Sequence, residues 1–419
     1  MRNFFFYLII VLYLSDFFWD QFLSYLNRTQ MSPNLPKELE GIYDSTEYAR
    51  QQAYQKENSR FAMISDGVSL VLVMTILLYG GVGWLDELLR RHIDNAVVLS
   101  VAFFWTFTIC SWFLDIPFSW YDTFIIEQKY GFNKTTRRTF AFDELKSVAL
   151  KLIIEGVIIS ILVVAFNYIK GYSWLWAWAA VSAFMLTISF FYSEWIVPIF
   201  NKQTPLEEGE LREAIEIFAR RVSFPISNIY VIDGSKRSTK SNAYFTGFGK
   251  KKRIVLYDTL INDLNKEEIT AILAHEIGHY KMKHVIYQMA ISISYTGLLL
   301  WALTLFLDNP EIAHALGGTT PSFHLAVVGF SLLYSPLSEI FNFGANYISR
   351  KNEYAADNFA ALHGTGEALI AGLKKISSKA LSNLTPHHFV VFWRYSHPTL
   401  LQRMRKIYDN ASIDLHNIM

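Results

Sequence analysis

The sequence predicts a mainly α-helical membrane protein: a bundle of seven transmembrane helices enclosing a chamber, with a small α+β domain at one end. The first observation behind this prediction is composition. Of the 419 residues, 52% are hydrophobic and only 18% are charged, and the mean hydropathy is +0.21. Soluble domains carry more charge, so much of the apolar surface must face lipid. The other two observations are a series of long apolar runs and the polar segment 201–284 that interrupts them.

Seven apolar runs give the order of the helices. A transmembrane helix needs about 20 predominantly apolar residues. Runs of this kind lie at 4–25, 67–85, 96–119, 147–168, 174–199, 285–307 and 323–347. The first run contains Asp16 and Asp20 and lacks a basic start and a small-residue cleavage site, so it predicts a retained span and not a signal peptide. The last run contains Pro336 and Glu339, and part of it could be a buried helix.

Polar side chains within these runs favour a hollow interior. They are costly in hydrocarbon but tolerated where they face water or the inside of a bundle. Hydrogen bonds between packed helices explain any single instance equally well, so only their number favours a chamber. These residues are Asp66, Asp115, Glu155, Glu194, Glu339, Asn342 and Asn346.

The distribution of lysine and arginine predicts the orientation of the bundle. The loops 26–66 and 120–146 together carry ten of these residues, whereas the opposite side offers Arg2, Arg90, Arg91 and Lys170. By the positive-inside rule, the side with the excess is cytoplasmic. The polar segment and the C-terminus fall on that side. The formal net charge of +1 gives no general attraction for nucleic acid, and the single cysteine excludes an intramolecular disulfide.

The chain is therefore divided into four parts. Residues 1–200 hold the first five spans and their loops, 201–284 form a small segment with a short sheet and the helix described next, 285–347 hold the last two spans, and 348–419 form C-terminal helices. Within the second part, 209–221 is typical of a helix, followed by strands at 228–233, 242–248 and 253–257 with a turn at 249–252. A short sheet thus precedes the next helix.

That next helix carries the most informative motif, His275-Glu276-Ile277-Gly278-His279. Positions i and i+4 share a helix face, so both histidines can bind one zinc ion while Glu276 contacts the water bound to it. Asn265 and Glu268 predict an N-terminal capping pair. An apolar stripe at helical spacing follows, made of Ile269, Ile272, Leu273 and Ile277. A small sheet before an H-E-x-x-H helix is the order found in zincin proteases, where an edge strand pairs with the substrate.

A catalytic zinc site needs a third protein ligand, and Glu353 is the best candidate. It follows the seventh span and so returns to the membrane side that holds the histidines. Asp357, one turn later, is predicted to accept the second ring N–H of a ligand histidine. The alternative for Glu353 is an ordinary exposed glutamate on a helix.

The residues resemble those of the type I CAAX prenyl proteases, also called farnesylated-protein converting enzyme 1. The resemblance covers most of the chain and is specific, because its blocks occur in the family's order with five spans before the metal helix. The blocks are Glu127–Thr135, Pro198–Lys202 with Pro205 and Leu206, Ser241–Phe248, the H-E-I-G-H motif, the segment Ser349–Asp357 and Ser396–Thr399. The chain is shorter than typical eukaryotic members and has no C-terminal dilysine signal. The membrane that holds the protein is therefore expected to be either the endoplasmic reticulum membrane or a bacterial inner membrane.

The resemblance implies an integral membrane zinc endopeptidase that cleaves near the C-terminus of prenylated CAAX proteins or peptides. It implies one zinc ion on His275, His279 and Glu353, with Glu276 as the base. The segment formed by Asn242, Ala243, Tyr244 and Phe245 would be the strand against which substrate lies. His397 and Arg403 fall on the family's H-P-x-x-x-x-R pattern. His397 is expected to stabilise the oxyanion and Arg403 to bind substrate. The expected partners are the prenylated substrate and membrane lipid, and the chain is expected to be a monomer.

Two other functions are open at this point. One is a membrane quality-control zinc protease of the heat-shock type, which has fewer spans before the motif. The other is a seven-span transporter or scaffold with a structural metal site. A closed structural site needs a fourth protein ligand, for which His284 and His363 are the candidates.

Overall fold

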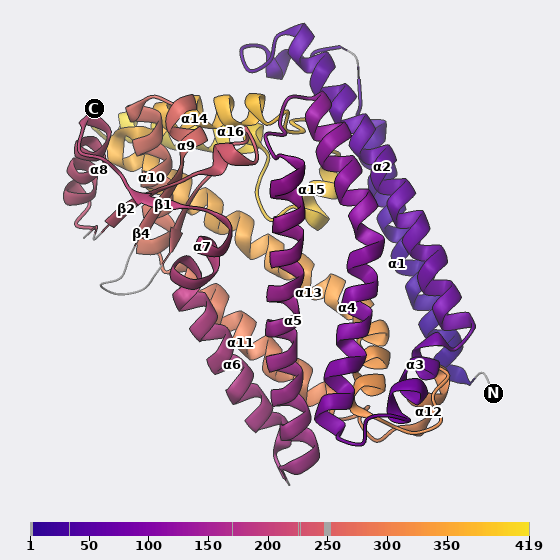
Figure 1. Cartoon of the computed structure of the whole chain (residues 1–419). Helices are drawn as coiled ribbons and strands as arrows, with labels where there is room; N and C mark the ends of the chain where they lie inside the picture. The colour runs from indigo at the N-terminus through magenta and orange to yellow at the C-terminus, as the bar shows by residue number, and fades with distance from the viewer. Residues whose placement is uncertain are drawn as a thin grey trace.

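The computed structural model describes residues 3–32, 34–169, 171–224, 226, 228–246 and 253–418. Long helices form a membrane-spanning bundle, and the strands with the short helices of residues 203–281 and 361–418 lie towards one end of it (Figure 1). Within these residues, seven helical segments are long and apolar enough to cross a membrane. The predicted fold class is confirmed: a seven-helix bundle with a small α+β domain.

The spanning segments agree in number and order with the predicted runs. They are α1 (Phe4–Thr29), α2 (Ser45–Leu78), α4 (Ala96–Tyr121) with η2 (Asp122–Glu127), α5 (Arg137–Tyr168), α6 (Ser173–Phe191) with η3 (Tyr192–Ile196) and α7 (Val197–Phe200), α11 (His284–Leu303), and α13 (Phe323–Ala360). Several ends differ from the prediction, and α5, for example, begins at Arg137 and not at 147. The run predicted at 67–85 is broken because α2 ends at Leu78 and Gly80 adopts φ 67°, so that α3 (Gly81–Arg90) is a separate helix. The last spanning helix, α13, continues to Ala360, well past the predicted end at 347.

Residues 45–66, predicted as part of a loop, form the first half of α2. Aromatic packing explains this extension, because Tyr48 and Tyr54 are buried in one cluster with Tyr130 and Phe132. The helix therefore continues past its lipid-facing part into the polar end of the molecule, where some of its side chains are buried. Hydropathy alone detects only the part that crosses the membrane.

Few residues of the spanning segments are buried. In the most apolar window of each span, the buried share lies between 6% and 28%. A cavity of about 350 Å³ lies between α1, α2 and α13 and is lined by Asp16, Asp20 and Asp66. Other predicted polar residues have partners: Glu155 accepts from Thr108, and Glu194 pairs with Arg253. The hollow interior and the pairing between helices therefore both occur.

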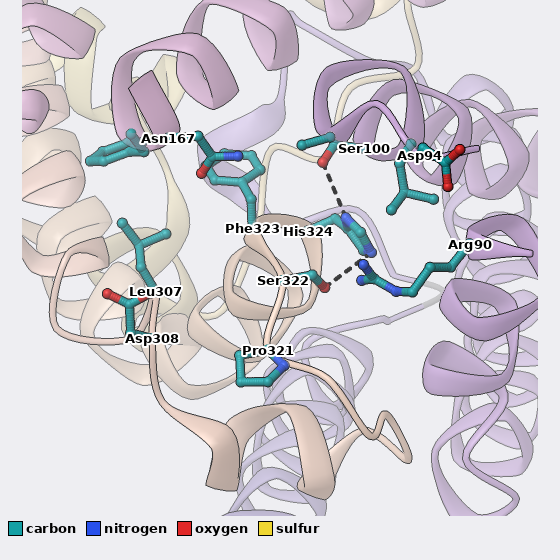
Figure 2. Close-up of a pocket in the computed structure, with 13 residues that line it drawn as sticks. Arg90, Asp94, Ser100, Asn167, Leu307, Asp308, Pro321, Ser322, Phe323 and His324 are labelled. Carbon is teal, nitrogen blue, oxygen red and sulfur yellow. Dashed lines mark hydrogen bonds between the residues drawn. The ribbon is translucent and has the colours of Figure 1, made fainter. Parts of the chain in front are cut away.

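The far end of the bundle, away from the sheet, has its own buried polar cluster. His324 near the start of α13 contacts Asp86 of α3 through Nε2 at 2.6 Å and Ser100 of α4 through Nδ1 at 3.1 Å. Figure 2 shows His324 between Ser100 and Ser322, beside a cavity of about 230 Å³. At the same end of the bundle, α3 lies against the turn that follows α12 (Pro310–Ala315). Glycine permits this close contact, since a Cβ on Gly83 would lie 2.1 Å from the carbonyl carbon of Gly317.

The small domain contains a four-stranded sheet of order β1-β2-β4-β3. Strands β2 (Asn228–Ile232) and β4 (Arg253–Tyr257) are parallel, while β1 (Gln203–Pro205) and β3 (Ala243–Thr246) pair antiparallel at the two edges. The predicted strands at 228–233 and 253–257 are present, and the one at 242–248 is present as far as Thr246. Strand β1 was missed, and residues 247–248 and the predicted turn 249–252 lie outside the described residues. The remaining elements are α8 (Glu210–Arg221), α9 (Asp258–Asp263), α10 (Lys266–Lys281), η6 (Ala361–Thr365), α14 (Gly366–Lys379), α15 (His388–Arg394), α16 (Leu400–Ile418) and the short turns η1 (Lys37–Leu39) and η4 (Gly234–Lys236).

Candidate metal centre

Local sequence fixes the helix that carries the motif. The predicted capping pair is present, because the Asn265 side chain accepts from the backbone N–H of Glu268 and the Glu268 side chain accepts from that of Asn265. The apolar stripe, represented by Ile269, Leu273 and Ile277, is buried in the core shared with the sheet and α8. With that face fixed, the histidines point to the side of α10 that α13 covers.

Two helices bring the three predicted ligands together. One ligand atom each from His275, His279 and Glu353 lies within 4.8 Å of the others. The two Nε2 atoms are 3.1 Å apart, and the Glu353 oxygens lie 3.5 Å from that of His275 and 3.3 Å from that of His279. Gly278 lets α13 approach this closely, since a Cβ there would meet the Cα of Ala356 at 3.2 Å.

The outward ring nitrogens of both histidines have partners. Nδ1 of His275 lies 2.8 Å from Asp357, and Nδ1 of His279 lies 2.9 Å from Nδ1 of His284. Arg403 in turn donates to both oxygens of Asp357, at 2.6 and 2.8 Å. These contacts fix the ring orientation of each histidine and leave both Nε2 atoms directed at Glu353.

The cluster fits a divalent metal ion. Ligands at about 2.1 Å in tetrahedral geometry stand roughly 3.4 Å apart, close to the three separations observed here. Charge agrees with geometry. Burial disfavours a protonated His275, yet Asp357 and Glu353 raise its pKa to about 9, so the site favours a positive charge.

The described part of the chain offers no fourth ligand in this cluster. His284 contacts the outward nitrogen of His279, and His363 contacts the carbonyl oxygen of Phe359. Two histidines and one glutamate with an open position are typical of catalytic zinc sites rather than structural ones.

Glu276, the predicted base, lies beside the first ligand on α10. Burial raises the pKa of its carboxyl group and the nearby Glu353 adds to this effect, while His275, His279 and Arg403 oppose it. A carboxylate whose pKa is raised toward neutrality is a better proton acceptor for catalysis than an ordinary surface glutamate.

The two C-terminal candidates lie at different depths. His397 is 63% exposed, with Nε2 3.3 Å from Glu353 and Nδ1 2.9 Å from the Ser396 hydroxyl, on the open side of the cluster. The side chain of Arg403 is only 12% exposed, and its guanidinium is occupied by Asp357. Its contacts are those of a residue that supports the ligands from behind, so substrate binding by Arg403 stays a prediction.

The predicted substrate strand lies at an edge of the sheet beside α10. Asn242, just before β3, is exposed, and its carbonyl accepts from the backbone N–H of Tyr257. Ala243 packs toward α10, whereas Tyr244 packs with Val197 and Ile232 on the opposite face. Ala243 to Thr246 pair with β4 on one side, which leaves the other edge of β3 as the side open to a further strand.

Fold and site together define an integral membrane metalloprotease of the zincin type. Comparison with known proteins gives the family. Residues 24–202 match the model "CAAX prenyl protease N-terminal, five membrane helices" and residues 205–411 match "Peptidase family M48". The chain therefore belongs to peptidase family M48, in its CAAX prenyl protease branch.

Relatives and solved structures cover almost the whole chain. "CAAX prenyl protease 1 homolog" of Oryza sativa subsp. japonica is 34% identical, over 92% of this chain and 93% of that protein. "CAAX prenyl protease 1" of Saccharomyces cerevisiae is 34% identical, over 93% and 92%. The crystal structure of S. mikatae Ste24p superposes with a TM-score of 0.91 at 31% identity and covers 97% of this chain and 99% of that one.

Proposed function

We propose that this chain is a zinc-dependent endopeptidase that cleaves near the C-terminus of prenylated CAAX proteins or peptides. The observation that carries the proposal is the convergence of His275, His279 and Glu353 beside the free edge of β3. The names of the relatives give the substrate class. An extended peptide pairs with β3 through its main chain, which supplies little specificity. Selection therefore falls to the prenyl group and the hollow bundle.

The residues around the cluster have distinct parts in this reaction. Zinc, when bound, polarises the scissile carbonyl and lowers the pKa of water. Glu276 takes the proton of the attacking water and passes it to the leaving amine. The Ser396 hydroxyl lies 2.9 Å from Nδ1 of His397. In the tautomer in which Nδ1 accepts from this hydroxyl, the ring proton is on Nε2, where it can be donated to the developing oxyanion. Asn242 to Phe245 hold the substrate main chain.

The test is a cleavage assay with two matched peptides. Purified protein of measured zinc content should cleave a farnesylated CAAX peptide with a higher kcat/KM than its unprenylated twin, and Asn242→Pro should impair both. Equal rates for the two peptides, together with cleavage of unfolded membrane proteins, would support the quality-control alternative. Absence of any cleavage by zinc-loaded protein would overturn the proposal.

We also propose that the site faces the cytoplasm, in the endoplasmic reticulum membrane or a bacterial inner membrane, and that the chain acts as a monomer. The loops with most of the lysine and arginine lie at the end of the bundle that holds the sheet (Figure 1). In sealed microsomes, with Cys110→Ser as background, an impermeant maleimide should label a cysteine at Glu207. A cysteine at Asn309 should react only after detergent is added. The reverse pattern would refute the orientation.

A further inference from the structure

One face of α13 contacts the C-terminal segment at four successive positions. Asn346, Arg350, Glu353 and Asp357 are spaced by four, three and four residues, so they share one face of the helix. Their contacts run in nearly the same order along the chain from α15 into α16, which lie beside α13. Glu353 contacts His397 and Asp357 contacts Arg403, as described above. The two earlier positions have no part in the site described so far.

Arg350 holds the end of α15. Its guanidinium, buried to 9% exposure, donates to the carbonyl oxygens of Val391 at 3.3 Å, Phe392 at 3.0 Å and Tyr395. The last carbonyls of a helix have no partner within the helix, and a cation placed there stabilises them. Asn346 adds contacts to the carbonyl oxygens of Trp393 and Arg394, at 3.4 and 3.2 Å. Because α15 has only seven residues, it depends on such contacts for its position.

His397 follows this anchored segment by two residues. Its ring has two polar contacts in the described part of the chain, with the adjacent Ser396 and with Glu353. The ring is largely exposed, so packing does little to fix it. Its place over the metal cluster is therefore set by the backbone that leads into it, and that backbone is tied to α13 through Arg350.

We infer that Arg350 is a positioning residue for catalysis: it ties the end of α15 to the helix that carries Glu353 and so places His397 at the scissile carbonyl. The inference rests on the proposed oxyanion role of His397. Anchor and third ligand are one turn apart on the same helix, so the two groups keep their separation when the rest of the C-terminal part moves. A displacement of His397 by about 1 Å would cost roughly a hundredfold in rate.

A double-mutant cycle between Arg350 and His397 tests the inference. Arg350→Gln should lower kcat for a farnesylated CAAX peptide about 10- to 100-fold, with KM and zinc content close to those of the wild type. In the His397→Ala background the same change should cost less than about threefold, because the group it positions is gone. Arg350→Lys should fall between, since one ammonium group cannot reach three carbonyls. The neighbouring exposed Lys351→Gln, which removes the same charge, should leave activity unchanged.

Two outcomes overturn the inference. Arg350→Gln could cost the same factor with and without His397, or it could lose zinc together with activity. If that variant does not fold, Asn346→Ala carries the test, with a loss of about 3- to 10-fold that again requires His397. Wild-type activity in His397→Ala alone would instead show that the oxyanion role is wrong, whatever Arg350 does.

Discussion

Two buried histidine–carboxylate clusters lie at opposite ends of α13, and only one is built to bind a metal. At the far end, His324 has partners on both ring nitrogens, Asp86 and Ser100. At the sheet end, one ring nitrogen of His275 contacts Asp357, and the other faces Glu353 and a second histidine. Burial of a histidine beside an aspartate is common to both, so it does not identify a ligand.

The difference lies in which atoms converge. At the far end each acceptor faces a donor, and Asp86 also pairs with Arg90, so the cluster is complete without an ion. At the sheet end two Nε2 atoms and a carboxylate meet at one point, and a cation between them satisfies all three. Convergence of lone pairs is therefore the mark of the site, and substitutions at the two ends should have different consequences.

The largest effect is expected where the metal stays and the chemistry is lost. Glu276→Gln leaves His275, His279 and Glu353 in place, so it should retain zinc and fold while kcat falls by about 10²- to 10⁴-fold. Metal analysis of the purified variant beside peptide cleavage measures both. Substantial turnover by Glu276→Gln would sink its assignment as the base.

Removing a converging ligand should affect metal and activity together. Glu353→Ala takes away one of the three proposed protein ligands, so bound zinc and cleavage should both fall, and added zinc should restore activity only in part. Competition with a chelator of known affinity gives the zinc dissociation constant. Unchanged zinc binding by this variant would point to another third ligand.

The same chemical change at the two clusters gives the sharpest contrast. Asp357→Asn should weaken zinc binding about 10- to 100-fold, because the partner of His275 loses its charge. Asp86→Asn, which is equally buried, should leave zinc affinity unchanged and lower the free energy of unfolding by about 1–3 kcal/mol. Chelator competition and thermal melting in detergent separate these outcomes. Loss of zinc from Asp86→Asn would remove the distinction drawn here.

The smallest effect is expected at Ser100. Its hydroxyl, His324 and Asp86 are ordered like a nucleophilic triad, but Ser100 is only 2% exposed and all three residues are buried. Ser100→Ala should cost about 1 kcal/mol of stability and leave peptide cleavage unchanged. A loss of hydrolysis at constant zinc content would contradict the structural role of this cluster.

The helix that carries the motif could be predicted because its signals are local in the sequence. Contacts between residues far apart in the sequence could not be predicted in this way. The capping pair of Asn265 and Glu268 and the motif lie within one short window, and Glu353 followed from membrane topology because an ion needs a third ligand. Strand β1 was missed because three residues with two polar side chains carry no alternating pattern. The pairing of Arg403 with Asp357 joins residues 46 positions apart, which no local periodicity encodes.

One property of α13 ties the chemistry to the lipid around it. The helix has 38 residues and is therefore about 57 Å long, nearly twice the thickness of a bilayer's hydrocarbon core. From Pro336 to Glu353 the distance is 17 residues, or roughly 25 Å, so a tilt of about 2° at the proline moves the carboxylate by nearly 1 Å. Hydrophobic mismatch is relieved by such tilting. A bilayer of different thickness that tilts α13 is therefore expected to shift Glu353, the proposed third ligand, and turnover should vary with acyl-chain length in reconstituted vesicles.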